Sequence, residues 1–152
     1  MLEETMETAY LHYNRAKDNY VEILHYHLNI EIYEDKEKIK TIDAFIFRFI
    51  KLQDFMGDKL FKVLLKNVGE YKDNMALIDI LDKLEKLEII HQADRWLDFR
   101  FIRNKLTHEY PNNVEDVITG IQLALEYFIE MEVVLMSITK YIETKQLFTL
   151  KK

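Results

Sequence analysis

The chain has 152 residues, 49% of them hydrophobic, which is enough for one substantial core and gives little support to a two-domain arrangement. Three glycines and one proline are too few for a sandwich or barrel of many short strands, and the lack of cysteine excludes disulfides, thiolate nucleophiles and cysteine-bound metals. The formal net charge of −6 argues against a general basic surface that coats nucleic acid, so any nucleic-acid contact is expected to be local.

Two long helices are predicted in the first half of the chain. Apolar and aromatic residues at helical spacing predict a helix over about 4–29. A charged stretch over 34–40 leads into a second apolar pattern with spacings of three and four residues, which runs from Ile42 to Leu64. This second helix is expected to end near Gly69, because glycine is a common C-terminal cap.

The third and fourth helices are predicted on either side of a break over 88–92. A short helix begins at or near Asn74, and the fourth helix runs from about Asp94, a good N-cap residue, to about Glu109. Pro111 fixes its end, because the residue before a proline is pushed away from helical dihedral angles.

The last predicted helix is apolar on most of its sides. Asn113 can cap it, with Glu115 and Asp116 favourably placed at its positive end, and it reaches roughly Thr144. Apolar residues on most of its sides predict that it forms the buried centre of the bundle.

These elements predict an all-α protein, an antiparallel bundle of four to five helices. We expect a single domain over residues 1–146 and a frayed tail over 147–152. The first residues lack the basic start and apolar run of a signal peptide, and no stretch approaches the roughly 18 apolar residues of a membrane helix. A cytoplasmic protein with no membrane partner is therefore expected.

The fourth predicted helix carries two apolar stripes instead of one. At 100° per residue, one face groups Trp96, Phe99, Ile102 and Leu106 and should enter the core. A second face, well over 90° away, groups Leu97, Phe101, Asn104 and His108. Its neighbour is either another helix of the same chain or a second subunit, in which case two symmetry-related helices build a shared cleft.

The end of this helix is also the densest basic and polar cluster of an otherwise acidic chain. Arg103 flanks the core stripe, and Arg100 and Thr107 fall between the two stripes. An ideal helix places Arg103 and His108 about 140° apart. Their convergence therefore needs the reach of the arginine, a distorted last turn or a contribution from a second subunit.

Residues 103 to 111 read RNKLTHEYP, which resembles the Arg-x4-His-x-Tyr signature of the HepT-like branch of the HEPN superfamily. From the composition of the chain, an Arg with His five places later is expected about 0.2 times by chance, and the pattern with Asn104 and Tyr110 about 0.0005 times. The family consists of helical domains of similar length with this signature near the end of a late helix. The stretch IDAFIFRFIKLQDFMGDKLF at 42–61 also resembles the long helix that such domains place against the motif helix. Charged residues in that stretch, including Asp43, Arg48 and Asp54, either line the cleft or form ordinary surface salt bridges.

The resemblance implies a metal-independent ribonuclease toxin of a toxin-antitoxin pair, acting as a homodimer with a site shared by two subunits. His108 can take a proton from a ribose 2′-hydroxyl or give one to the leaving 5′-oxygen. Arg103 can hold the phosphate and offset its charge, and Asn104 can orient either group. The resemblance also implies that a partner nucleotidyltransferase, the antitoxin, attaches AMP to Tyr110 and so blocks the site. Further candidate phosphate or cleft contacts are Arg100, Thr107 and Lys105.

Other interpretations use the same residues. The chain can be a non-catalytic subunit that presents a nucleotide or substrate to a nucleotidyltransferase, or a structural dimerisation module. In the structural interpretation Arg103 is a salt-bridge residue, His108 closes a helix near its negative end, and Tyr110 packs over the turn.

No cofactor or metal is predicted. Two Glu-x-x-His pairs, Glu22 with His25 and Glu88 with His91, have the spacing of helical di-metal sites. About 0.5 such pairs are expected by chance, and His91 lies in the predicted break. The sequence also lacks a glycine-rich phosphate loop and a serine nucleophile signature.

Overall fold

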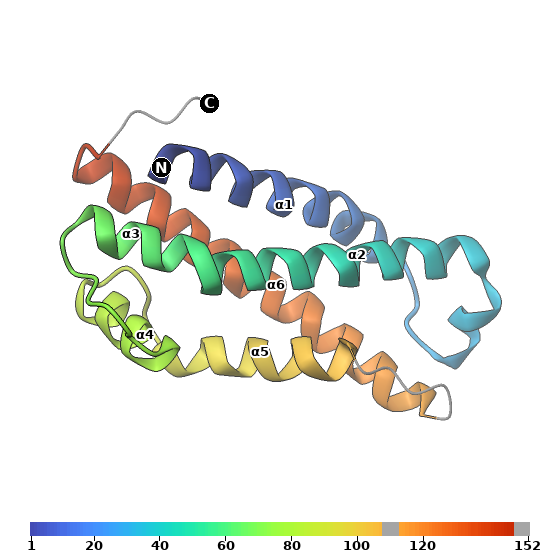
Figure 1. The fold of residues 1–152 in the computed structure, drawn as a ribbon. Coiled ribbons are helices and arrows are strands. Elements are labelled where there is room, and N and C mark those ends of the chain that lie inside the picture. Colours follow the sequence, from blue (N-terminus) through green and yellow to red (C-terminus); the bar gives the residue numbers. More distant parts are fainter. Residues whose placement is uncertain (108–112, 148–152) are drawn as a thin grey trace.

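A computed structural model describes residues 1–107 and 113–147, and every regular element within these ranges is a helix. The four long helices are α1 (Leu2–Ile23), α2 (Lys36–Phe55), α5 (Ala93–Thr107) and α6 (Val114–Thr144). Figure 1 shows that α1 and α5 run in one direction and that α2 and α6 run in the other. The predicted all-α antiparallel bundle is therefore confirmed.

Helix α1 ends six residues earlier than the apolar pattern predicts. It stops at Ile23, and a short 3-10 helix, η1 (Ile30–Glu34), follows a turn. Tyr26 and Leu28 still pack against the core from this turn, which is why the apolar spacing continued past the end of the helix. The side chain of Asn29 accepts a hydrogen bond from the backbone N–H of Glu31 and so begins the new helical turn.

Helix α2 begins where a capping residue allows it. The Asp35 side chain accepts a hydrogen bond from the Lys38 backbone N–H at 3.2 Å, which satisfies one of the unpaired donors of the first turn. Every third or fourth residue of α2 is buried, from Ile42 through Phe45 and Phe49 to Leu52. That stripe faces the core.

The second predicted helix is interrupted near its middle by a π-helical turn, η2 (Met56–Leu60), before it continues as α3 (Phe61–Asn67). A π turn inserts one extra residue and shifts the side chains that follow, and such turns occur often at functional sites. The predicted end near Gly69 is confirmed, because Gly69 has φ +76° directly after the cap residue Val68.

Helix α4 (Leu77–Lys86) begins three residues after Asn74, near the predicted start, but Asn74 does not cap it. Asn74 instead adopts a left-handed conformation with φ 65°, which asparagine tolerates in turns. The Asp79 carboxylate accepts a hydrogen bond from the Ala76 backbone N–H and stabilises the first turn of α4. The predicted break after α4 is confirmed, with Glu88 at φ 61°.

The starts of α5 and α6 differ from their predicted caps. Asp94 lies inside the first turn of α5, where its negative charge interacts favourably with the positive end of the helix. The Glu85 carboxylate accepts a hydrogen bond from the Ala93 backbone N–H at 2.6 Å. Asn113 stands at the N-cap position of α6, but its side chain donates to the Asp116 carboxylate and caps no backbone group. The predicted end of the fourth helix at Glu109 and Pro111 lies outside the described residues.

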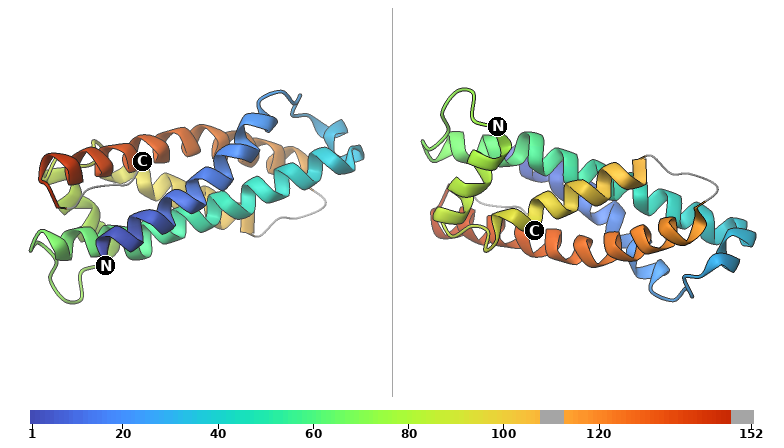
Figure 2. Two further views of the ribbon diagram at one scale, coloured as in Figure 1. Left: turned by 90° about the horizontal axis from the view of Figure 1, so that it is seen from above. Right: turned by 90° about the horizontal axis from the view of Figure 1, so that it is seen from below.

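Helix α6 was predicted to be the buried centre of the bundle, but it is not buried on most of its sides. It packs one stripe against α1, α2 and α5 and exposes Val133 and Met136 on another side. The views in Figure 2 show the long helices side by side, with η1 and α4 at opposite ends of the bundle. Leu147, expected in the tail, is partly buried against the core. The rest of the predicted tail lies outside the described residues.

Helices α1 and α6 are joined by a polar cluster around Glu132. Its carboxylate accepts hydrogen bonds from the Tyr13 hydroxyl and from the Lys17 ammonium, the latter at 2.9 Å. Burial raises the pKa of Glu132, but these two hydrogen bonds and the charge of Lys17 outweigh it and hold the pKa below its ordinary value. The charged form of Glu132 is thus part of the packing of α1 on α6.

Across the described ranges, no helix has both the length and the apolar character needed to cross a membrane.

Candidate functional site

Arg103, the first residue of the RNKLTHEYP segment, is fixed by a carboxylate of α2. Its Nε donates to Asp54 Oδ1 at 2.9 Å and its Nη2 donates to Asp54 Oδ2 at 2.8 Å, which makes a bidentate ion pair between α5 and α2. These hydrogen bonds raise the pKa of the Arg103 guanidinium above its ordinary value and outweigh the opposing effect of burial. The guanidinium is therefore a permanent cation with a defined orientation.

The remaining edge of this guanidinium faces two polar side chains of α5. Its Nη1 donates to Asn104 Oδ1 at 3.3 Å and to Thr107 Oγ1 at 3.2 Å, and both distances are long for such bonds. With the two bonds to Asp54, four of the five N–H groups of Arg103 have partners among the described residues. The guanidinium keeps one free N–H and two weakly held ones, which a ligand oxygen can use.

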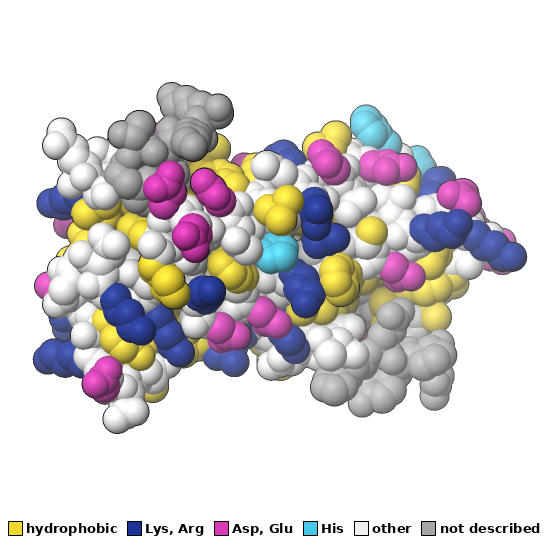
Figure 3. Space-filling view, turned by 45° about the horizontal axis from the view of Figure 1, so that its top comes forward, with side chains coloured by type: hydrophobic (Ala, Val, Ile, Leu, Met, Phe, Trp, Pro, Cys, Tyr) yellow, Lys and Arg dark blue, Asp and Glu magenta, His cyan; other side chains and the backbone are white. Residues whose placement is uncertain are grey.

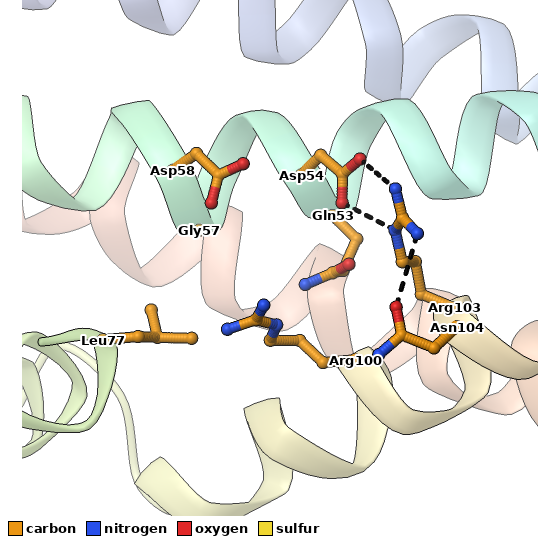
Figure 4. Close-up of a pocket in the computed structure, with 8 residues that line it drawn as sticks. All are labelled: Gln53, Asp54, Gly57, Asp58, Leu77, Arg100, Arg103 and Asn104. Atoms are coloured by element: carbon orange, nitrogen blue, oxygen red, sulfur yellow. Dashed lines mark hydrogen bonds and ion pairs between the residues drawn. The ribbon is translucent and has the colours of Figure 1, made fainter.

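Arg103 stands on the wall of a polar cavity between α2, η2, α4 and α5, with a volume of about 240 Å³. The lining side chains carry two carboxylates, two guanidiniums and two amides; Figure 4 shows them as Gln53, Asp54, Gly57, Asp58, Leu77, Arg100, Arg103 and Asn104. Asp58 and Arg100 are exposed and form no ion pair with another residue of the described ranges. The formal charges of the lining cancel, so the cavity suits a polar ligand with both donors and acceptors.

Two buried polar atoms near the cavity have no hydrogen-bond partners among the described residues. Gln53 is 2% exposed, and its Oε1 has no hydrogen-bond partner among the described residues. The indole Nε1 of the buried Trp96 also lacks one. A Cβ atom at Gly57 would lie 3.2 Å from that indole nitrogen and 3.9 Å from Gln53 Nε2. The lack of a side chain at Gly57 therefore lets the π turn pack closely against these two buried polar groups, and each group without a partner costs free energy.

The predicted site residues fall into three groups. Arg103, Asn104 and Arg100 line the cavity together, and Thr107 holds Arg103 from the next turn of the helix. Lys105 is exposed and is not part of the cavity lining. His108 and Tyr110 lie outside the described residues.

The predicted pairing of the second helix with the motif helix agrees with the observed contact of α2 with α5. Of the three charged residues named there, Asp54 lines the cavity, whereas Asp43 and Arg48 do not.

The two stripes of α5 have different surroundings. Trp96, Phe99, Ile102 and Leu106 are buried, as predicted. Leu97 is 41% exposed and Phe101 is 67% exposed. Within the described part of the chain, no helix covers Leu97 and Phe101.

Sequence reasoning missed Gln53, Gly57, Asp58 and Leu77. Asp54 and Asp58 are four residues apart, a spacing that puts two carboxylates on one helical face, and this was the available signal. The π turn, which brings Gly57 to the cavity, has no comparable signature in the sequence.

Among the described residues, no group of three or more His, Asp or Glu side chains is arranged to hold a metal ion. A scan against protein-family models, a search of the curated proteins and a search of the solved structures each found no match.

Proposed function

We propose that this protein is a metal-independent ribonuclease, the HepT-like toxin of a toxin-antitoxin pair, which cuts RNA at a site shared by two subunits. The observation that carries the proposal is the position of Arg103. The arginine that begins the RNKLTHEYP segment stands on the wall of a polar cavity, beside Asn104 and with weakly held N–H groups on one edge.

In the proposed reaction the ribose 2′-oxygen attacks the adjacent phosphorus. A new P–O2′ bond forms, the P–O5′ bond breaks, and the products are a 2′,3′-cyclic phosphate and a 5′-hydroxyl. One proton leaves the 2′-hydroxyl and one proton reaches the 5′-oxygen, and an imidazole that titrates near neutral pH, here His108, can serve either transfer. No metal is required for this balance.

Arg103 stabilises the negative charge that develops on the phosphate. A phosphate that binds beside Asp54 meets a carboxylate with the same sign of charge. Arg100 offsets this repulsion, because it lines the same cavity and forms no ion pair with the described residues. The need for a 2′-hydroxyl restricts the substrate to RNA.

The outer face of α5 supports the proposal of a second subunit. Leu97 and Phe101 form an apolar stripe on the same helix as Arg103, and they are exposed in the single chain. A two-fold contact along this stripe would cover both side chains and bring two motif helices together. In such a dimer each subunit contributes a His108, so that one can act as the base and the other as the acid. In the same proposal, a nucleotidyltransferase antitoxin silences the site by attaching AMP to Tyr110.

The test is RNA cleavage by the purified protein in the presence of a chelator. We expect cleavage that leaves 2′,3′-cyclic phosphate ends, and a loss of about a hundredfold or more in His108→Ala. His27→Ala is the matched control, because His27 is an exposed histidine of the turn after α1. Equal cleavage by wild type and His108→Ala, or none by the dimeric wild type, excludes the catalytic claim. Expression of wild type and of His108→Ala in cells adds a growth test, in which wild type should inhibit growth more strongly than the variant.

A second candidate function is a non-catalytic nucleotide-binding subunit of a nucleotidyltransferase. The polar lining of the cavity favours it, because Gln53, Asp58 and Arg100 offer an amide, a carboxylate and a guanidinium. A nucleobase carries both donors and acceptors on one edge. Titration of a mononucleotide into wild type and Arg103→Ala, followed by calorimetry, distinguishes the two functions. Binding that needs Arg103, in a protein that does not cleave RNA, favours the subunit.

A further inference from the structure

Basic and aromatic side chains gather on the side of the bundle formed by α1 and α2, and none of them lines the cavity. His12 and Arg15 come from α1, and Phe47, Arg48 and Lys51 come from α2; we call these five residues the α1/α2 patch. Burial, and then the charges of Arg48, Lys51 and Arg15, lower the pKa of the His12 imidazole. Figure 3 shows this side of the molecule, with dark-blue side chains close to the histidine near its centre.

The aromatic member of the patch faces solvent. Phe47 is 52% exposed, with the Arg48 guanidinium 5.1 Å and the Lys51 ammonium 5.4 Å from the centroid of its ring. Both cations lie over the ring, and the side chain remains half exposed, so that a base can stack on it. An exposed phenylalanine between two cations contributes little to the core.

The cations of the patch differ from two other cations of the bundle in that they form no ion pair. Lys17 of α1 and Arg95 of α5 each pair with a glutamate of α6. Within the ranges that the structure describes, Arg15, Arg48 and Lys51 form no ion pair. Three like charges around one histidine repel each other, and this is notable in a chain of net charge −6. A polyanion would relieve that repulsion.

We propose that the α1/α2 patch binds single-stranded RNA and guides it toward Arg103. This inference rests on the proposed ribonuclease function, for which it supplies the path of the substrate. Proteins that hold single strands combine cations for the phosphates with aromatic rings on which bases stack, and the patch contains both. An acidic polypeptide would satisfy the cations but would have no use for the exposed ring.

The patch also lies next to the candidate site. Lys51 and Asp54 are three residues apart on α2, which corresponds to about 4.5 Å along the helix axis. Asp54 is the partner of Arg103. A strand that crosses Phe47 and Lys51 therefore reaches the Arg103 guanidinium without leaving the surface of α2.

The test is equilibrium binding of a short fluorescent oligouridine, measured by anisotropy over a series of salt concentrations. The protein carries His108→Ala so that the RNA stays intact. The patch variant adds Arg15→Gln, Arg48→Gln and Lys51→Gln. The charge-matched control instead adds Lys72→Gln, Lys86→Gln and Lys140→Gln, all exposed positions outside the patch.

We expect the patch variant to bind at least tenfold more weakly than the control and its log–log salt slope to fall by about 2, since each phosphate contact on a single strand contributes about 0.7. Phe47→Ala should weaken binding on the order of tenfold and leave the salt slope unchanged. Circular dichroism checks the fold of each variant. If the triple variant does not fold, Lys51→Gln with Phe47→Ala, both at exposed positions, replaces it.

Three results would overturn the inference: no RNA binding by the parent protein, equal affinity and slope for patch variant and control, or binding of polyglutamate as tight as RNA and insensitive to Phe47→Ala. Cleavage by protein with an intact His108 separates this inference from the proposed function. Patch-dependent RNA binding without cleavage keeps the inference and rejects the ribonuclease. Cleavage with an unchanged KM in the patch variant rejects the inference and keeps the ribonuclease.

Discussion

The Asp54→Asn substitution measures how strongly the cavity is held together by the ion pair with Arg103. The substitution keeps the size of the side chain but removes its charge and one of its two acceptors. Arg103 then loses one of its two hydrogen bonds to residue 54 and keeps the other only to an uncharged acceptor, while its guanidinium remains charged.

The expected cost follows from the geometry and the exposure of the pair. A hydrogen bond to a charged group contributes about 1.5–3 kcal/mol when it is buried. The Arg103 side chain is 27% exposed and that of Asp54 is 37% exposed, so solvent screens part of this energy. We therefore expect Asp54→Asn to lower the free energy of unfolding by about 1–2 kcal/mol, which corresponds to a fall in Tm of about 2–8 °C for a domain of this size.

Urea denaturation followed by tryptophan fluorescence is a direct assay, because Trp96 is the only tryptophan and is buried beside the cavity. Asp58→Asn is the matched control. Asp58 lines the same cavity but forms no ion pair with the described residues, so its substitution should change stability by less than about 0.5 kcal/mol. Equal stability of the two variants would refute the structural role assigned to the Asp54–Arg103 pair.

Three further predictions concern other parts of the molecule. Gly57→Ala should destabilise the protein by about 1 kcal/mol in thermal unfolding, because the new Cβ lies 3.2 Å from the confined Trp96 ring. Gly120→Ala should be neutral or stabilising in the same measurement, because its Cβ meets a flexible leucine methyl at that distance. Glu132→Gln should lower the free energy of unfolding above the ordinary glutamate pKa of 4.5. This loss should vanish as the pH falls through the lowered pKa of Glu132, because the wild-type side chain is then also uncharged. A loss of stability that does not depend on pH in urea titrations would contradict this. Phe101→Asp should weaken self-association at least tenfold in sedimentation experiments, because it places a charge in the proposed two-fold contact, and unchanged association would exclude that face as the contact.

The helices were predictable from the sequence because their signals are local. The buried stripe of α5 follows from Trp96, Phe99, Ile102 and Leu106 at helical spacing, and the end of α3 follows from Gly69. The predicted helix boundaries were wrong where residues outside a helix also pack against the core. The turn after α1 still carries apolar residues at helical spacing, because Tyr26 and Leu28 contact the core from that turn.

The site was predictable only in part, since its composition depends on which helices meet. The sequence identified Arg103, Asn104 and Arg100 on one helix. It offered Asp54 only as one of several charged residues, because no local pattern shows which carboxylate an arginine of another helix will reach. Whether the polar atoms of Gln53 and Trp96 lack hydrogen-bond partners depends on the π turn and on how the helices pack, and neither feature has a sequence signature.

The central claim is that Arg103 and His108 act on one phosphate, and a double-mutant cycle on RNA cleavage tests it most directly. Single-turnover rates are measured for wild type, Arg103→Ala, His108→Ala and the double variant. Because groups that act as a unit are strongly non-additive, we expect the double variant to be no slower than the slower single variant, with each single loss at about a hundredfold or more. Multiplied losses in the double variant, or wild-type rates in either single variant, would contradict the claim.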